Sequence, residues 1–328
     1  MKKQKFITVI IATYNRCESL KDTLDSLFKQ ECKGDFDYEI IVVDNNSKDK
    51  TKELTESYFQ KFNGKLKYLF EPNQGKSIAL NKAIEVANGG ILAFSDDDCI
   101  LDKSWLTSIF EFFEKNQGDA MGGRVLPLYP DKTPQWVKNN RELLKSPFVS
   151  HDYGEGTKIY ENKEMVPFVG ANMAIKSVVF DEHGLFKTDL GPGTGLMGDD
   201  TELFRRFEKN KELYYCGKAL VWHKVDKGRM NYGYMAKYFF TLGRYSLRKQ
   251  YTKLETKELS CFFYIPRCFL RNIIWSACVL VVSLFSINKF LKRWIILFWE
   301  IGECYEYRVL KISEVKNKFP KRIIDDGE

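Results

Sequence analysis

Three consecutive carboxylates, Asp96, Asp97 and Asp98, follow directly after a short apolar segment at residues 91–94. Neighbouring carboxylates repel one another and each favours water, so three of them at the end of a strand do not stabilise the fold. They suit a divalent cation, because Mg²⁺ and Mn²⁺ bind carboxylate oxygens and leave coordination positions for phosphate oxygens. A solvated acidic turn is the alternative interpretation of such a short motif.

The segments before this triplet alternate between two kinds of apolar pattern. Continuous apolar runs predict buried strands, and Leu20, Leu24 and Leu27 are spaced as on one face of a helix. This order predicts an α/β fold with a doubly wound, mostly parallel central sheet that is flanked by helices. The predicted strands cover residues 6–12, 38–43, 67–70 and 91–94, and the predicted helices cover residues 18–28, 50–62 and a segment that follows residue 76.

Polar residues stand where the predicted strands end. Residues 13–15 follow the first strand, Asp44 follows the second, and the three aspartates follow the fourth. Parallel sheets bind ligands outside the carboxyl ends of their strands, so these groups are expected to converge on one crevice. This convergence favours the metal site over the acidic turn.

The sequence contains neither of the two standard glycine-rich phosphate loops, G-x-G-x-x-G after the first strand or G-x-x-x-x-G-K-[ST]. A diphosphate in this crevice would therefore be neutralised mainly by a cation and by basic side chains. Lys76, next to Gly75, is a candidate for this role; a solvated lysine at the start of a helix is the alternative.

The composition of the 328-residue chain limits the classes of partner and compartment. The net charge of +7 comes without a nucleic-acid motif, which predicts no nucleic-acid partner. The eight cysteines are scattered without a C-x-x-C pair, which is typical of reduced cytosolic thiols. The apolar run near the N-terminus is short and lacks a cleavage site, so a first buried strand is expected there in preference to a signal peptide.

Six segments, in order along roughly residues 5–245, together resemble glycosyltransferase family 2, which has the GT-A fold. The resemblance implies an inverting, metal-dependent transfer of a sugar from a nucleotide-sugar, with UDP favoured, to a hydroxyl of a glycan or lipid-linked saccharide in cell-surface polysaccharide or glycoconjugate biosynthesis. Mn²⁺ or Mg²⁺ is the implied cofactor. The segments are VIIATYNR (9–16), IIVVDNNS (40–47), NQGKSIALNKA (73–83), FSDDD (94–98), FVGANMAI (168–175) and GDDTELFRR (198–206).

The resemblance also implies residue roles on the donor side. Asp98 is the first choice for direct metal contact and Asp96 is nearer the ribose, although both belong to the implied metal site; Asp97 fits either role. Lys76 would lie near the nucleotide. The base and ribose would be held by Thr13, Tyr14, Asn15 and Asp44.

On the acceptor side, Gly198-Asp199-Asp200 stands where the family usually shows G-E-D. The second acidic residue of that motif resembles the catalytic base, which maps to Asp200 and would take the proton of the acceptor hydroxyl. Asp199 is one methylene shorter than the usual Glu and is a second candidate for contact with the acceptor. Both aspartates also suit the N-terminus of the following helix.

Three further residues have two interpretations each. Asn172 lies in the segment that the resemblance places on the acceptor side, where it would touch the donor or acceptor sugar. Trp136 is either a stacking platform for a sugar or a packed core residue. His223 is either a further metal or phosphate ligand or a hydrogen-bonded structural histidine.

We expect three regions: a nucleotide-sugar-binding half at residues 1–118, an acceptor-binding and catalytic half at residues 119–245, and a C-terminal helical region at residues 246–328. The last contains an apolar stretch at residues 273–287 with basic flanks, shorter than the about 20 residues of a spanning helix. This pattern favours a helix that lies on an anionic membrane, which predicts a peripheral or monotopic protein at the cytoplasmic face. A buried core helix and a short span are the alternatives.

Other functions are open at this point. A processive polysaccharide synthase is the nearest, but no Q-x-x-R-W follows Asp200. A catalytically silent nucleotide-sugar-binding membrane scaffold would show damaged carboxylates, and these are present. A nucleotidyltransferase would need a glycine-rich first loop, which is missing.

Overall fold

The structure is a computed structural model that describes residues 3–32, 34–115, 118–160, 168–194, 196–207, 212–251, 261–262, 265–282 and 287–318. The chain forms two compact units. The first, which we call the sheet unit, comprises Met1–Asp131 and Phe148–Asp226; the second, the helical unit, comprises Lys132–Pro147 and Lys227–Glu328. Both predicted halves, residues 1–118 and most of 119–245, thus fall into one compact unit.

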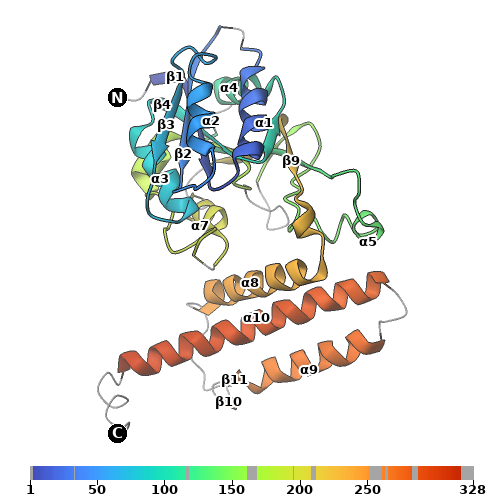
Figure 1. The fold of residues 1–328 in the computed structure, drawn as a ribbon. Helices are drawn as coiled ribbons and strands as arrows, with labels where there is room; N and C mark the ends of the chain where they lie inside the picture. Colours follow the sequence, from blue (N-terminus) through green and yellow to red (C-terminus); the bar gives the residue numbers. More distant parts are fainter. Residues whose placement is uncertain are drawn as a thin grey trace. The chain divides into compact units, whose positions relative to one another are not determined.

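The sheet unit is built on a mixed sheet whose described strands run in the order β3-β2-β1-β4-β8-β6-β9-β5, with β7 beside β9 (Figure 1). The four strands from β3 to β4 are parallel, as predicted. β8 then pairs antiparallel with both β4 and β6, and β5 pairs antiparallel with β9. The sheet is therefore less parallel than predicted. The strands are β1 (Lys3–Thr13), β2 (Asp37–Asp44), β3 (Leu66–Phe70), β4 (Gly89–Asp96), β5 (Cys99–Leu101), β6 (Ala120–Leu128), β7 (Thr157–Ile159), β8 (Asn172–Lys176) and β9 (Leu213–Lys224).

Helices cover both faces of this sheet, because alternate residues of the central strands are apolar on both sides. Ile7, Val9 and Ile11 of β1 belong to the core formed with α1, α2 and α4, whereas Ile10 belongs to the core formed with α3, α6 and α7. The expected double winding is thus present. The helices are α1 (Cys17–Phe28), α2 (Thr51–Ser57), α3 (Lys76–Val86), α4 (Trp105–Lys115), α6 (Ser177–His183) and α7 (Asp199–Phe207).

The helical unit is dominated by three helices, of which α10 packs against both α8 and α9. The predicted boundary between residues 245 and 246 lies inside α8. Within the described residues, no helix is both long enough and apolar enough to cross a membrane. Part of the predicted apolar stretch, residues 283–286, lies outside the described residues. The elements are α5 (Gln135–Lys138), the short 3₁₀ helix η1 (Lys227–Arg229), α8 (Tyr232–Tyr251), β10 (Cys261–Phe262), β11 (Ile265–Pro266), α9 (Arg267–Val282) and α10 (Ile287–Lys318).

Two glycines let α8 and α10 approach at backbone distance. A β-carbon on Gly243 would lie 2.1 Å from the carbonyl oxygen of Trp299, and one on Gly302 would lie 2.0 Å from that of Phe240. Both distances are far below van der Waals contact, so only glycine fits at either position.

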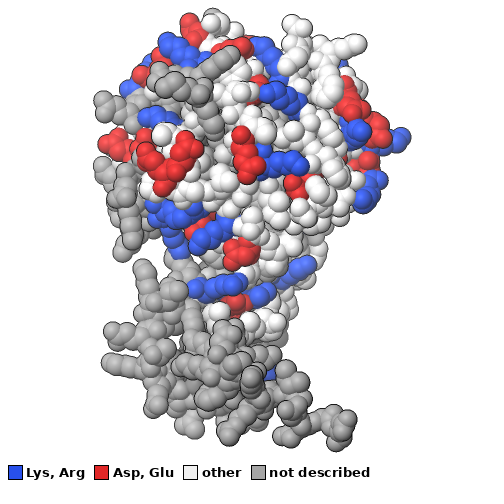
Figure 2. All heavy atoms as spheres, turned by 90° about the vertical axis from the view of Figure 1, so that its left-hand side faces the viewer, with Lys and Arg blue, Asp and Glu red and all other residues white. Residues whose placement is uncertain are grey.

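Charge on the surface is mixed. On the face in Figure 2, described acidic and basic side chains are interspersed. The excess of seven positive charges is therefore not gathered into a single patch on this face.

Candidate active site

The register of the parallel strands brings the predicted polar residues to one edge of the sheet. Thr13 at the end of β1 is paired with Asp44 at the end of β2, and Ala12 is paired with Asp96 at the end of β4. The loops beyond the strands are joined as well, because the backbone N–H of Asn45 donates to the carbonyl of Thr13 over 2.9 Å. The predicted convergence of these strand ends is confirmed.

The loop after β1 forms the rim of this edge. Tyr14 is 47% exposed, and Asn15 adopts a left-handed backbone conformation with φ of 52°. The Asn15 side-chain oxygen accepts a hydrogen bond from the N–H of Lys48 over 2.6 Å, which ties this loop to the loop after β2. Asp44 is buried and accepts hydrogen bonds from the Tyr68 hydroxyl and the Ser47 N–H, both over 2.8 Å. Contact of these residues with a nucleotide stays a prediction.

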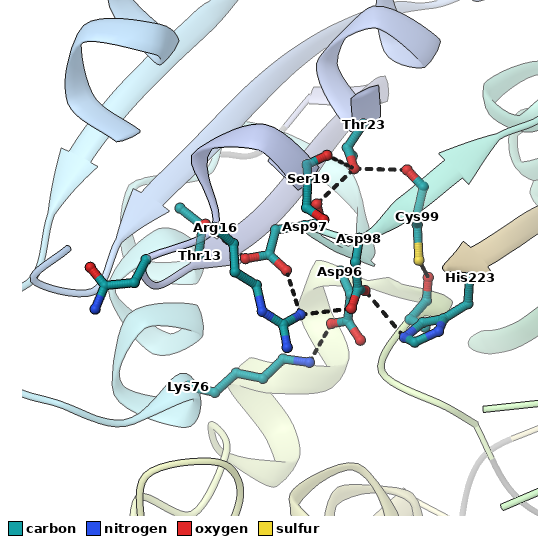
Figure 3. A network of polar contacts seen from close by, with 12 residues as sticks. Thr13, Arg16, Ser19, Thr23, Lys76, Asp96, Asp97, Asp98, Cys99 and His223 are labelled. Carbon is teal, nitrogen blue, oxygen red and sulfur yellow. Dashed lines mark hydrogen bonds and ion pairs between the residues drawn. The ribbon is translucent and has the colours of Figure 1, made fainter. Parts of the chain in front are cut away.

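The aspartate cluster, which we define as Asp96, Asp97 and Asp98, is held by a second set of contacts (Figure 3). Arg16 Nη1 lies 3.2 Å from Asp97 Oδ1 and 2.6 Å from Asp98 Oδ2, and the Thr13 hydroxyl donates to Asp97 Oδ2 over 2.7 Å. Burial raises the pKa of Asp97 to about 6, and the charge of Arg16 opposes this rise. Asp97 therefore fastens the end of β4 to the start of α1.

Asp96, Asp98 and His223 form what we call the metal triad. They offer ligand atoms that all lie within 4.8 Å of one another. The antiparallel pairing of β5 with β9 sets Cys99 opposite His223 and so brings the imidazole to Asp98, whose Oδ1 lies 3.1 Å from His223 Nε2. His223 is buried, and its Nδ1 makes no hydrogen bond within the described part of the chain.

This donor set fits a divalent cation. Two carboxylates and one neutral imidazole are ordinary ligands for a first-row transition metal, and Mg²⁺ prefers oxygen ligands alone. A buried ring nitrogen without a partner is also costly unless something binds near it.

Lys76, the first residue of α3, lies at the other side of Asp96 and forms an ion pair with its Oδ1. Burial alone would lower the pKa of Lys76, but the carboxylates of Asp96, Asp199 and Asp200 outweigh it and raise the pKa. Asn45 holds the loop that leads into α3, because its side chain donates to the carbonyl of Asn73 over 2.6 Å and accepts from the N–H of Gly75 over 2.8 Å.

Asp199 and Asp200 are the first two residues of α7. Asp200 Oδ2 accepts from the N–H of Gly170 over 3.1 Å, and its Oδ1 accepts from the N–H of Thr201 over 2.7 Å. A β-carbon on Gly191, where φ is +95°, would lie 2.9 Å from Asp199 Oδ2, so this glycine leaves room for the carboxylate. Burial raises the pKa of both aspartates, and their mutual repulsion raises that of Asp199 further.

Both predicted interpretations of these two aspartates are compatible with their position. Acidic residues in the first turn of α7 interact favourably with the helix dipole. The backbone contacts of Asp200 also hold its carboxylate in a fixed orientation, as a general base requires.

The sequence interpretation gave no role to Arg16 or Asn45. Arg16 is the last residue of the segment 9–16, and Asn45 lies in the segment 40–47, both of which carry the resemblance. Their position in these segments is the feature of the sequence that could have indicated a role in the site. Their contacts with the aspartate cluster and with the loop before Lys76 needed the fold.

The prediction that Asn172 touches a sugar is not supported by its contacts. Asn172 is fully buried, its amide donates to the carbonyls of Arg124 and Ala219 over 2.9 and 2.7 Å, and its oxygen accepts from Trp105 Nε1 over 2.8 Å. Both of its N–H donors and one acceptor position of its oxygen are used inside the core, which is typical of a structural residue.

Trp136 belongs to the helical unit, where its ring stacks on Tyr232 with centroids 4.9 Å apart and planes at 18°. This contact agrees with the prediction of Trp136 as a packed residue.

A cavity of about 510 Å³ opens beside the aspartate cluster within the sheet unit. Asp98 and Arg16, whose side chain is 42% exposed, both line it. The residues that line it include Asn15, Arg16, Cys17, Asp49, Asp98 and Lys224.

Comparison with known proteins finds a matching family and several similar proteins. Residues 8–184 match the sequence model of the family described as Glycosyl transferase family 2. Glycosyltransferase AglE of Haloferax volcanii is 33% identical over 126 residues, which is 38% of this chain and 41% of AglE. The glucosyl-dolichyl phosphate glucuronosyltransferase of the same organism is 26% identical over 250 residues, which is 70% of this chain and 72% of that protein.

Solved structures show the same fold at low identity. Mannosyltransferase PcManGT from Pyrobaculum calidifontis, in complex with GDP-Man and Mn²⁺, aligns with a TM-score of 0.56 and 18% identity over 98% of this chain and 89% of that chain. Staphylococcus aureus TarS 1-349 in complex with UDP-GlcNAc aligns with a TM-score of 0.55 and 16% identity over 100% of this chain and 95% of that chain. The fold is thus of the GT-A type. Since the family match covers more than half of its residues, the chain belongs to glycosyl transferase family 2.

Proposed function

We propose that this glycosyltransferase is inverting and metal-dependent, and that it moves a sugar from a nucleotide-sugar to a hydroxyl group of a glycan or lipid-linked saccharide. The observation that carries the proposal is the position of Lys76. Its ammonium group pairs with Asp96 of the metal triad and also lies within electrostatic reach of Asp199 and Asp200. The residues proposed to hold a diphosphate and the residue proposed as the base are therefore neighbours of one lysine.

The residues divide the chemistry between them. Asp96, Asp98 and His223 would hold the cation, which when bound would offset the charge that develops on the leaving diphosphate. Lys76 and Arg16 supply further positive charge at the same edge. Asp200, oriented by the N–H groups of Gly170 and Thr201, would take the proton of the acceptor hydroxyl as the new bond forms. Attack from the face opposite the diphosphate inverts the anomeric carbon.

The donor is proposed from chemistry and from relatives. The names of two structural neighbours include GDP-Man with Mn²⁺ and UDP-GlcNAc, so UDP and GDP are the first nucleotides to test. Relatives such as ExoM of Rhizobium meliloti, a succinoglycan biosynthesis protein that is 25% identical over 240 residues, support a place in polysaccharide or glycoconjugate biosynthesis.

Calorimetry of UDP, GDP and dTDP with and without Mn²⁺ or Mg²⁺ tests this proposal. We expect one nucleotide to bind in a metal-dependent way. Asp98→Ala is expected to lower the metal-dependent affinity at least about tenfold, because it removes a ligand of the triad. Asp35→Ala, an exposed aspartate of the same unit, is the matched control and should bind as the wild type does. Nucleotide binding that ignores both the metal and Asp98→Ala would contradict the proposed site.

We further propose that the protein acts at the cytoplasmic face of an anionic membrane as a peripheral or monotopic protein. The support comes from α9, which contains no acidic residue and exposes Ile274, Trp275 and Val281 to 62%, 67% and 63%. Exposed basic residues flank this segment in the sequence, namely Arg271 on α9 and Lys289 and Lys292 on α10. Apolar side chains between basic flanks suit insertion into the headgroup region of an anionic leaflet.

Flotation of the full chain with vesicles tests this placement. We expect stronger binding to phosphatidylcholine vesicles that contain phosphatidylglycerol than to phosphatidylcholine alone. The double variant Trp275→Ser, Val281→Ser should bind about tenfold more weakly, since it removes apolar surface from the lipid contact. The matched control Phe28→Ser, Val86→Ser alters two exposed apolar residues of the sheet unit and should leave binding unchanged. Equal losses in both variants would refute α9 as the contact surface.

A further inference from the structure

A loop leads into α7 and so into the two aspartates at its start. Its described residues are 184–194 and 196–198, between α6 and α7. The buried apolar side chains of α7 itself are Leu203, Phe204 and Phe207, which follow its first turn. The position of the two carboxylates therefore depends on the first turn and on the loop that leads into it.

Helix α3 holds this loop with two side chains. The Asn81 amide donates to the carbonyl of Phe186, and its oxygen accepts from the N–H of the same residue, both over 2.9 Å. The Ser77 hydroxyl, which is fully buried, donates to the carbonyl of Leu190 over 2.9 Å. Ser77 and Asn81 are four residues apart and so lie on one face of α3. We call these two residues the α3 clamp.

Gly191 connects the α3 clamp to the carboxylates. A β-carbon on Gly191 would lie 2.9 Å from Asp199 Oδ2 and 3.2 Å from the Ser77 hydroxyl oxygen, so this residue lies against both groups. The loop also contacts the start of α3, where the N–H of Lys76 donates to the carbonyl of Pro192 over 3.2 Å. A loop that moved away from α3 would therefore leave its contact with the Asp199 carboxylate as well.

The same helix begins with Lys76, whose side chain reaches Asp96 (Figure 3). One helix thus carries both the lysine on the donor side and the clamp on the loop that leads to the base. We infer that Asn81 and Ser77 are positioning residues for the general base, because they fix the loop before α7 and through it the carboxylate of Asp200 relative to Lys76. The inference rests on the proposed function, in which Asp200 is the base.

The N–H of Gly170 can report the position of the base. It donates to Asp200 Oδ2 over 3.1 Å, and Gly170 belongs neither to the loop before α7 nor to α3. NMR of the full chain with isotope-labelled glycine measures the hydrogen exchange of this amide, and Asp200→Ala gives its rate without the hydrogen bond. We expect Asn81→Ala to raise the exchange rate at least about tenfold over the wild type.

Asn88→Ala is the matched control for a loss of stability. It removes an asparagine of the same unit whose amide donates to Glu39 Oε2 over 3.0 Å. Exchange at Gly170 should stay within about twofold of the wild type in this variant. Ser77→Ala removes the other contact of the clamp and should act in the same direction as Asn81→Ala, so it serves for the same measurement if Asn81→Ala does not fold.

Reaction rates separate the positioning of the base from a general loss of structure. Release of nucleotide from UDP-GlcNAc or GDP-Man with Mn²⁺ gives the rate, with water in the place of the acceptor hydroxyl. Asn81→Ala should lower kcat about tenfold or more and leave KM for the donor within about twofold, since a group displaced by about 1 Å loses much of its effect. In an Asp200→Asn background the same substitution should change the residual rate by no more than about twofold, because no base is left to misplace.

Two results would overturn the inference. One is exchange at Gly170 that is the same in Asn81→Ala as in the wild type. The other is an equal loss of rate from Asn81→Ala in the wild-type and Asp200→Asn backgrounds, which would show that Asn81 does not act through the base. If Asp200→Asn alone releases nucleotide as fast as the wild type, the base of the proposed function is wrong, whereas exchange at Gly170 still decides whether the clamp places the carboxylate.

Discussion

Asp200→Asn is expected to lower kcat by about 10²–10⁴-fold, the usual contribution of a positioned general base, while nucleotide binding persists. The amide has nearly the same shape as the carboxylate and keeps one acceptor oxygen, so it can keep one of the two hydrogen bonds from the N–H groups of Gly170 and Thr201. It cannot take a proton from the acceptor hydroxyl. Initial rates of sugar transfer, with calorimetry of the nucleotide on the same preparations, separate the loss of chemistry from a loss of binding.

Asp199→Asn is the matched comparison, because it removes the neighbouring carboxylate and leaves Asp200 in place. We expect a smaller loss of kcat. A larger loss in Asp199→Asn than in Asp200→Asn would reassign the base to Asp199.

The pH dependence of the transfer rate of the wild type should report the protonation of Asp199 and Asp200. Burial and the charge of Asp200 raise the pKa of Asp199 to about 6, and burial raises the pKa of Asp200 as well. A carboxylate with a raised pKa is protonated over a wider acidic range, and the protonated form is not a base. The rate should therefore fall as the pH drops, at a higher pH than an ordinary aspartate would give. Asp199→Asn, which leaves Asp200 without the neighbouring carboxylate, should move this acid limb to lower pH.

Asn172→Leu is expected to lower the free energy of unfolding by about 4 kcal/mol or more, since it leaves three buried polar groups without a partner at about 1–3 kcal/mol each. These groups are the carbonyls of Arg124 and Ala219 and the indole N–H of Trp105. Domains are stable by only about 5–15 kcal/mol, so the melting temperature should fall steeply and the yield of folded protein with it. Thermal unfolding followed by circular dichroism measures the change.

Asn139→Leu is the control, because Asn139 is exposed and makes its side-chain hydrogen bond at the surface. It should change stability by no more than about 0.5 kcal/mol. An Asn172→Leu protein with unchanged stability but lost activity would restore the sugar-binding interpretation.

The sequence was sufficient for the part of the fold that depends on local patterns. The first four strands and their parallel pairing followed from apolar runs and helical spacing, and the meeting of Thr13, Asp44 and Asp96 followed from the rule that parallel strands end at one edge. His223 was named from its place after an apolar run.

Pairings between distant segments were not predictable in the same way. Nothing local indicates that β8 inserts antiparallel between β4 and β6, because strand direction depends on the path of the chain between strands. Asn172 is an example of a residue whose role depends on such distant partners. An asparagine suggests a polar surface role until Trp105 and two carbonyls, each more than 40 residues away in the chain, are seen around it.

Arg16 was missed for a related reason. An arginine at the start of a helix is ordinarily solvated, and its partners Asp97 and Asp98 lie 81 and 82 residues further along the chain. Only the parallel pairing of β1 with β4 brings the two loops together.

The glycine contacts between α8 and α10 have a mechanical consequence. Gly243 faces the carbonyl of Trp299 and Gly302 faces that of Phe240, so each helix carries a notch that receives the backbone of the other. If α10 slid along α8 by one residue, a side chain would be driven against a carbonyl oxygen at both notches. The two helices therefore resist sliding along each other, so a displacement of either helix along its axis would displace the other as well.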